Sequence, residues 1–292
     1  MKMVVAYDSM MRIPGFWVRE TRRGSDGTMW KLRGISYQSM EEARARLEER
    51  WRLRKAFAAL RTVSEADVEQ YSAALRALDE LQDDDYRVLL LEPVLEEWDG
   101  ENVVTRNRYG VQVLNSTTLC FVDVDDVPLS LGDKWRALWG HKMSPEEKLL
   151  QGVRKLCAAD DSLGARVYRT HHGWRIMLEG KGIAPDSPRM HALFAALHAD
   201  PLYASLCVRQ QCWRARLTPK PYRVGISRFP KAMDSESVRT AESQEWLQRY
   251  EILSQGKAVC RLIDRIGRPL TSPWVERHDQ LTGAKRMDAP LA

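Results

Sequence analysis

The chain of 292 residues has a formal net charge of +5, with 44% hydrophobic and 29% charged residues. This length and composition can bury one large core or two modest ones, which excludes a disordered or fibrous protein. No stretch approaches the roughly 18 apolar residues that a membrane-spanning helix needs, and residues 1–11 lack the pattern of a secretory signal. We therefore expect a cytoplasmic protein that does not enter membranes.

Residues 1–85 predict a small separate unit of two strands and two helices. Two short runs with aromatic residues, within 16–32, are joined by turn residues and predict a hairpin. Ser39 and Ser64 each have an acidic residue three positions later and begin an apolar pattern at helical spacing. Residues 40–100 hold 16 acidic and 9 basic residues, so this helical pair is an acidic surface that a protein partner could contact.

From residue 86 the pattern changes to a mixture of strands and helices. Runs rich in β-forming residues predict strands at 88–91, 110–113, 117–124 and, around a glycine turn, 165–178. Ser144 and Ser187, each followed by proline, are typical helix starts. We predict an α+β fold, with a mixed or antiparallel sheet and helices packed on one face, over residues 86–240. Residues 241–292 are interpreted as a C-terminal extension.

Asp123 lies inside the apolar run of the predicted strand 117–124, and Asp125 follows directly after it. Alternation along a strand places both carboxylates on one face, about 6.5 to 7 Å apart. Neighbouring carboxylates repel each other, and a divalent cation such as Mg²⁺ or Mn²⁺ is the usual solution. The alternative is that these aspartates end a strand in a turn before Pro128.

A second polar group of residues surrounds the predicted turn at Gly173. Thr170, His172 and Arg175 are of the types that bind phosphate oxygens, and a glycine turn between two strands can direct them at one point. The alternative is an ordinary hairpin turn with solvent-exposed histidines.

The third feature is a basic segment, in which residues 200–231 hold seven basic residues and one acidic residue. Its central cations are predicted to bind the nucleic-acid backbone, and Trp213 or Tyr222 to stack on a base. The alternative is a basic edge strand that its charges protect from aggregation. The cations predicted to contact nucleic acid are Arg214, Arg216, Lys220 and Arg223.

In chain order, these three features resemble the catalytic core of archaeo-eukaryotic primases, the primase-polymerase superfamily. In that family a carboxylate pair binds the metal, which matches Asp123 and Asp125. The next motif, a Ser or Thr followed after a glycine by a His, contacts the phosphates of the incoming nucleotide. Thr170 matches it, Arg175 stands at the usual His position, and no third strand-borne acidic residue matches. The resemblance covers about residues 87–231 and implies an RRM-like core.

Three functions follow as hypotheses. In the first, the protein is a nucleotidyltransferase that adds nucleotides to a nucleic-acid end or template, with Mg²⁺ or Mn²⁺ on Asp123 and Asp125 and the triphosphate held by Thr170, His172 and Arg175. In the second, the same fold binds nucleic acid or a nucleotide without turnover, within a larger complex. In the third, it is a metal-dependent phosphodiesterase. The metal site requires both carboxylates to face one open cleft, and a carboxylate locked to a core arginine would favour the turn interpretation.

Overall fold

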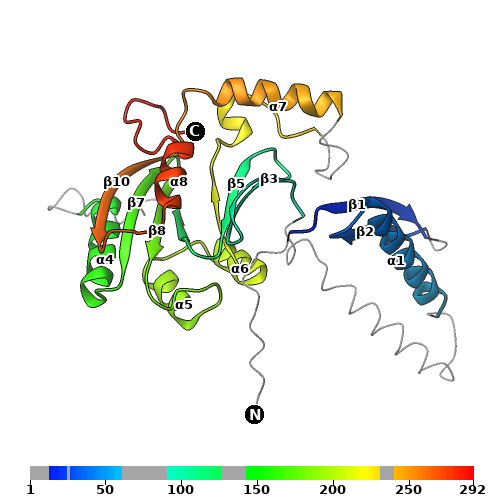
Figure 1. The fold of residues 1–292 in the computed structure, drawn as a ribbon, viewed down its shortest axis with the longest axis horizontal. Coiled ribbons are helices and arrows are strands. Elements are labelled where there is room, and N and C mark those ends of the chain that lie inside the picture. Colours follow the sequence, from blue (N-terminus) through cyan, green and yellow to red (C-terminus); the bar gives the residue numbers. More distant parts are fainter. Residues whose placement is uncertain (1–12, 25–26, 61–90, 126–142, 231–239) are drawn as a thin grey trace, which may run out of the picture. The chain divides into compact units, whose positions relative to one another are not determined.

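The computed structural model describes residues 13–24, 27–60, 91–125, 143–230 and 240–292. Within these residues the chain forms six α-helices and several antiparallel sheets, so the predicted α+β class is confirmed (Figure 1). The described residues divide into two compact units, one within 95–228 and 248–292 and the other within 12–94 and 229–247. None of the described helices is both long enough and apolar enough to cross a membrane.

The N-terminal part of the second unit contains a hairpin and one long helix. Strands β1 (Phe16–Arg23) and β2 (Met29–Ser36) pair antiparallel along their whole length, as predicted. Helix α1 (Met40–Leu60) begins after Ser39, whose hydroxyl accepts a hydrogen bond from the amide of Glu42 at 3.1 Å. The ββα part of the predicted unit is therefore confirmed, whereas the predicted second helix lies outside the described residues.

Close packing of α1 on β2 depends on a glycine. A Cβ atom at Gly34 would lie 1.7 Å from the carbonyl oxygen of Ala43, so no larger residue fits there without moving the helix. Ala43 and Leu47 turn their side chains inward from α1, and Trp17 and Ile35 are buried on the hairpin. The apolar spacing that predicted the helix thus marks its buried face.

A four-stranded antiparallel sheet is the centre of the larger unit, with the strand order β10-β7-β8-β6 (Figure 1). Its members are β6 (Cys120–Asp125), β7 (Gly164–Thr170), β8 (Gly173–Glu179) and β10 (Cys260–Gly267). Strands β7 and β8 form the predicted hairpin around the glycine turn. The C-terminal residues, which the sequence pattern sets apart as an extension, contribute β10 to this sheet.

A second sheet in the same unit has the order β3-β4-β5-β9. Its strands are β3 (Val94–Asp99), β4 (Asn102–Arg106), β5 (Gln112–Ser116) and β9 (Trp213–Arg216). The predicted strand at 88–91 lies outside the described residues except for Leu91. Strand β9 brings the predicted basic segment into this sheet.

The remaining helices are α4 (Pro145–Ala159), α5 (Pro188–Ala196), α6 (Pro201–Gln210), α7 (Ala241–Ser254) and α8 (Trp274–Thr282). Helix α4 starts with a capping box, in which the Ser144 hydroxyl accepts from the Glu147 amide and the Glu147 carboxylate accepts from the Ser144 amide. Both local signals that predicted helices, at Ser144 and Ser187, are confirmed.

Helix α8 covers part of one face of the central sheet through a buried polar group. The His278 ring lies 5.4 Å from the rings of Phe121 and Tyr168. Asp279 accepts a hydrogen bond from the Tyr168 hydroxyl at 2.7 Å and one from Arg166. Because Tyr168, His278 and Asp279 are buried, the carboxylate is stabilised by hydrogen bonds in place of water.

Candidate functional site

The two predicted metal ligands share one face of the central sheet. In the register of β6 and β8, Asp123 lies opposite Arg175 and Asp125 lies opposite Gly173. Side chains of directly opposed residues in an antiparallel pair point to the same face. Thr170 of β7 is also opposite Gly173, so Asp125, Gly173 and Thr170 form one row across the sheet. Asp125 is exposed, and Asp123 and Thr170 are half-buried.

The Asp123 carboxylate forms an ion pair with Arg175, which is 1% exposed. Arg175 Nε donates to Asp123 Oδ1 at 3.1 Å, and its Nη1 donates to the carbonyl oxygen of Arg216 at 3.0 Å. Burial alone would lower the pKa of Arg175, but the charge and hydrogen bond of Asp123, together with Cys260 and Tyr203, raise it above its ordinary value, so the guanidinium stays protonated. The pair therefore places a permanent positive charge beside the carboxylate.

This donor set does not fit a divalent cation at Asp123. A metal ion bound there would lie next to a buried guanidinium that already neutralises the carboxylate, and the two cations would repel each other. The described residues also contain no group of three or more His, Cys, Asp or Glu side chains that could hold a metal ion. Asp123 is paired with a buried arginine, and this arrangement favours a structural role for its carboxylate.

Strand β9 presents its two arginines differently. Trp213 and Ala215 are buried, and Arg214 and Arg216, which alternate with them along the strand, are half-buried. The Arg214 guanidinium donates to the Gln210 side chain of α6 at 3.3 Å. Because Trp213 is fully buried, it cannot stack on a base, which leaves Tyr222 as the aromatic partner predicted by the sequence.

Arg216 lies among other cations. Burial, and then the charge of Arg175, lower its pKa to about 10, while Asp123 opposes the shift and Arg223 adds to it. We call Arg216, Lys220 and Arg223 the basic cluster. None of the three forms an ion pair with a carboxylate of the residues that the structure describes, although the charge of Asp123 acts on Arg216.

A short 3₁₀ helix, η2 (Pro221–Val224), holds the outer part of the basic cluster. Its Tyr222 is 66% exposed, with Lys220 Nζ and Arg223 Cζ at 5.8 Å and 5.7 Å from the ring centroid. The segment is anchored below the surface, since Tyr250 donates from its hydroxyl to the side chain of Thr218 at 2.9 Å. Tyr222 is therefore an exposed ring on an anchored segment, and Lys220 precedes it and Arg223 follows it in the sequence.

Two histidines lie in the turn between β7 and β8. His171 and His172 are both exposed, with ring centroids 4.3 Å apart. Burial first, and then the charges of Arg223, His172 and Lys220, lower the pKa of His171. The sequence predicts His172 as a phosphate ligand, and in the structure the charges of Arg223 and Lys220 act on the adjacent His171.

The structure thus brings most of the predicted residues to one end of the central sheet. Asp123, Arg175 and Arg216 are directly connected, and the charges of Lys220 and Arg223 act on His171 in the turn that follows Thr170. Arg214 is the exception. What the sequence did not indicate is the pairing of Asp123 with Arg175, because only the strand register places them opposite each other.

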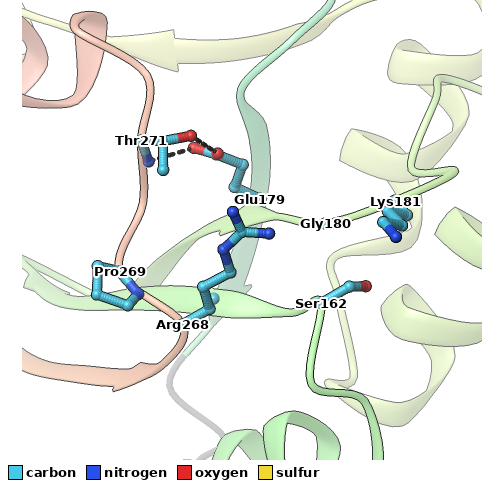
Figure 2. Close-up of a pocket in the computed structure, with 8 residues that line it drawn as sticks. Ser162, Glu179, Gly180, Lys181, Arg268, Pro269 and Thr271 are labelled. Atoms are coloured by element: carbon cyan, nitrogen blue, oxygen red, sulfur yellow. Dashed lines mark hydrogen bonds between the residues drawn. The ribbon is translucent and has the colours of Figure 1, made fainter.

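A separate cavity of about 260 Å³ lies at the other end of β8 (Figure 2). Lys181 and Arg268 line it, and Figure 2 shows the Arg268 side chain extending toward Glu179. The Glu179 carboxylate accepts hydrogen bonds from the amides of Thr271 at 3.0 Å and Ser272 at 3.2 Å. These interactions hold together the ends of the strand and of the segment before α8, so we interpret the cavity as structural.

Comparisons of this chain with protein-family models, with curated proteins and with solved structures found no match. The resemblance to primase-polymerases therefore rests on the sequence motifs alone.

Proposed function

We propose that this protein is a nucleic-acid-binding module that holds backbone phosphates with the basic cluster and does not need a metal ion to do so. The observation that carries the proposal is Arg216, a half-buried guanidinium whose pKa is lowered to about 10 by burial and by Arg175. Cations kept close together without a carboxylate partner are typical of sites that receive an anion. A phosphate would remove the repulsion between Arg216 and Arg223.

Tyr222 favours nucleic acid over a free inorganic anion. An exposed aromatic ring offers a surface for a base, and stacking of this kind contributes about 1–3 kcal/mol per base. Lys220 and Arg223 lie near the same ring, where they can contact the phosphates that flank a stacked base. The proposal includes the finer fold expectation of an RRM-like primase-polymerase core, with which the central sheet agrees in having four strands and antiparallel pairing.

The salt dependence of binding tests this proposal. Each phosphate contact releases counterions, so a Lys220→Ala/Arg223→Ala variant should bind a single strand more weakly and reduce the slope of log K against log salt by about 1.4. The matched control, Lys181→Ala/Arg268→Ala, removes the same charge from the cavity at the other end of β8. Equal losses in the two variants would show a nonspecific charge effect and contradict the proposal, as would an unchanged slope in the first.

Nucleotidyl transfer is a second candidate function. It is favoured by one observation, that Asp123, Asp125 and Thr170 share a face near the basic cluster. Against it stands the ion pair of Asp123 with Arg175. An assay of nucleotide incorporation separates the two functions, because binding without incorporation is the expected behaviour of the module.

A further inference from the structure

The hairpin of β1 and β2 has two faces, and α1 covers one of them (Figure 1). Gly34 faces the helix, because a Cβ atom on it would meet the backbone of Ala43. Trp30, four residues earlier on β2, has its ring centroid 4.9 Å from the guanidinium carbon of Arg54 in α1. Side chains alternate along a strand, so the residues between these positions on β2 point away from the helix.

The face that points away from α1 is cationic. Directly opposed residues of an antiparallel pair share a face, and the register of the two strands gives three such rows here. These rows are Arg19 with Arg33, Thr21 with Lys31, and Arg23 with Met29. We call these six residues the hairpin face. Four of them are cations and none is a carboxylate.

The hairpin face is open to solvent at the end near the turn. Trp17 and Ile35 continue the same face toward the other end, and both are 1% exposed. By contrast, Arg23 and Lys31 are exposed, and Met29 is 60% exposed. Among the residues that the structure describes, no carboxylate forms an ion pair with Arg23 or Lys31. The exposed end is therefore positively charged.

The surrounding part of the chain carries charge of the same sign. Residues 13–24 and 27–60 contain 11 basic and 5 acidic residues, and the acidic excess of residues 40–100 comes from residues 61–100. Glu20 and Glu48 both pair with Arg22, whose partner in register is Trp30 on the helix-facing side. These carboxylates thus belong to the covered face. The positive charge of the open face attracts a polyanion.

We propose that the hairpin face binds double-stranded DNA by entering its major groove. The site lies in a different unit from the basic cluster and does not depend on it. A two-stranded β-ribbon is one of the elements that fit the major groove of B-form DNA, which is about 12 Å wide. Four residues of strand, from Arg19 to Arg23, extend about 13 Å, and a duplex carries roughly eight phosphates over that length.

The side chains of the hairpin face suit both the walls and the floor of this groove. Arginine and lysine donate to phosphate oxygens and to the acceptors of guanine. Thr21 and Met29 offer apolar groups for contact with the methyl group of thymine. Duplex RNA has a deep and narrow major groove that side chains cannot read, so the proposal is specific for DNA.

The experiment measures fluorescence anisotropy of a labelled DNA duplex of about 20 base pairs, two helical turns, with the whole protein over a range of salt concentrations. The variant Arg23→Ala/Lys31→Ala removes two exposed cations of the hairpin face. Its matched control, Arg52→Ala/Lys55→Ala, removes one arginine and one lysine from exposed positions of α1. Binding of a single strand is measured in parallel. Retention of that binding shows that both variants are folded.

Arg23→Ala/Lys31→Ala should bind the duplex about tenfold more weakly or worse. The slope of log K against log salt should fall by about 1.8, since each phosphate contact on B-form DNA contributes about 0.9. The control should keep most of the affinity. A duplex whose cytosines carry glucosylated hydroxymethyl groups, which fill the major groove, should bind poorly, as should duplex RNA.

Equal losses in the two variants would show a general effect of charge and overturn the inference. Equal binding of plain and glucosylated DNA, or of DNA and RNA duplexes, would overturn the entry into the major groove. A loss of duplex binding in Lys220→Ala/Arg223→Ala as large as in Arg23→Ala/Lys31→Ala would assign the duplex to the basic cluster. Binding of polyglutamate without binding of the duplex would indicate an acidic protein partner instead. Each of these results leaves single-strand binding by the basic cluster to its own test.

Discussion

The substitution Asp123→Ala distinguishes a structural ion pair from a pair of metal-binding carboxylates. The two explanations predict changes of opposite sign in the free energy of unfolding. In the structure, Asp123 neutralises a guanidinium that is 1% exposed. Removing the carboxylate leaves the Arg175 charge buried with the Arg216 carbonyl as its remaining partner. If instead Asp123 and Asp125 were two repelling carboxylates that need a cation, removing one of them in the absence of metal would stabilise the fold.

The loss of stability expected for Asp123→Ala lies between two limits. Removing one partner of a fully buried pair costs about 3–5 kcal/mol, and an exposed pair contributes about 0–1 kcal/mol. The Asp123 side chain is 31% exposed, and the hydrogen bond from Arg175 to the carbonyl oxygen remains. Asp123→Ala should therefore lower the free energy of unfolding by about 2 kcal/mol.

Urea unfolding at neutral pH, with a chelator present, measures this change as a shift in midpoint at constant slope. Asp125→Ala is the control, since that residue is exposed on the same strand and face, and it should change stability by less than about 0.5 kcal/mol. Equal effects of the two substitutions, or a gain in stability for Asp123→Ala, would refute the ion-pair explanation and return the carboxylates to the metal interpretation.

Three further outcomes are expected. If nucleotidyl transfer occurs, Asp123→Ala should lower incorporation of labelled nucleoside triphosphates by more than about 100-fold, and equal signal from both proteins would indicate a contaminating polymerase. Burial raises the pKa of Asp279, but its hydrogen bonds with His278 and Tyr168 and the charges of His278 and Arg166 together lower it more, so Asp279→Asn should destabilise the fold at neutral pH. The free energies of unfolding of wild type and variant should converge as the pH falls below about 3.9, and a difference that stays constant with pH would contradict this. Gly34→Ala should lower the stability of the N-terminal hairpin and helix by about 3 kcal/mol or more, because its Cβ would collide with Ala43. Hydrogen exchange in these elements measures the loss. Gly15→Ala is the control and should be tolerated, because the space around Gly15 is open.

The elements that the sequence predicted well are those encoded by consecutive residues. Ser144, the following proline and Glu147 contain the whole capping box, and the hydrogen bonds form within one turn of helix. The turn at Gly173 is similar, because its φ of 143° is a conformation that glycine adopts readily. In both cases the decisive contacts join residues a few positions apart, so a local pattern was sufficient.

The contacts that form the candidate site join residues that are far apart in the sequence. Asp123 and Arg175 are 52 positions apart, and a shift of one residue in the register of β6 against β8 would place the guanidinium on the opposite face. No local pattern carries that register. Strand β10 was missed for a related reason, since it mixes charged and apolar residues without alternation and is defined by its pairing with β7. Helix α6 was missed although it has a local signal, Asp200 as N-cap followed by proline. The same-face placement of Asp123 and Asp125, by contrast, needs only the period of two.

The position of β10 has a consequence for the way the chain folds during synthesis. Until residues 260–267 have been made, β7 has no partner on one side and presents a row of free amide and carbonyl groups along the sheet. Such an open edge can pair with the strand of another chain. Antiparallel pairing between segments so distant in the chain is also slow to form. A growing or truncated chain that stops before β10 is therefore expected to aggregate or to depend on chaperones, and one that reaches β10 closes that edge with its own strand.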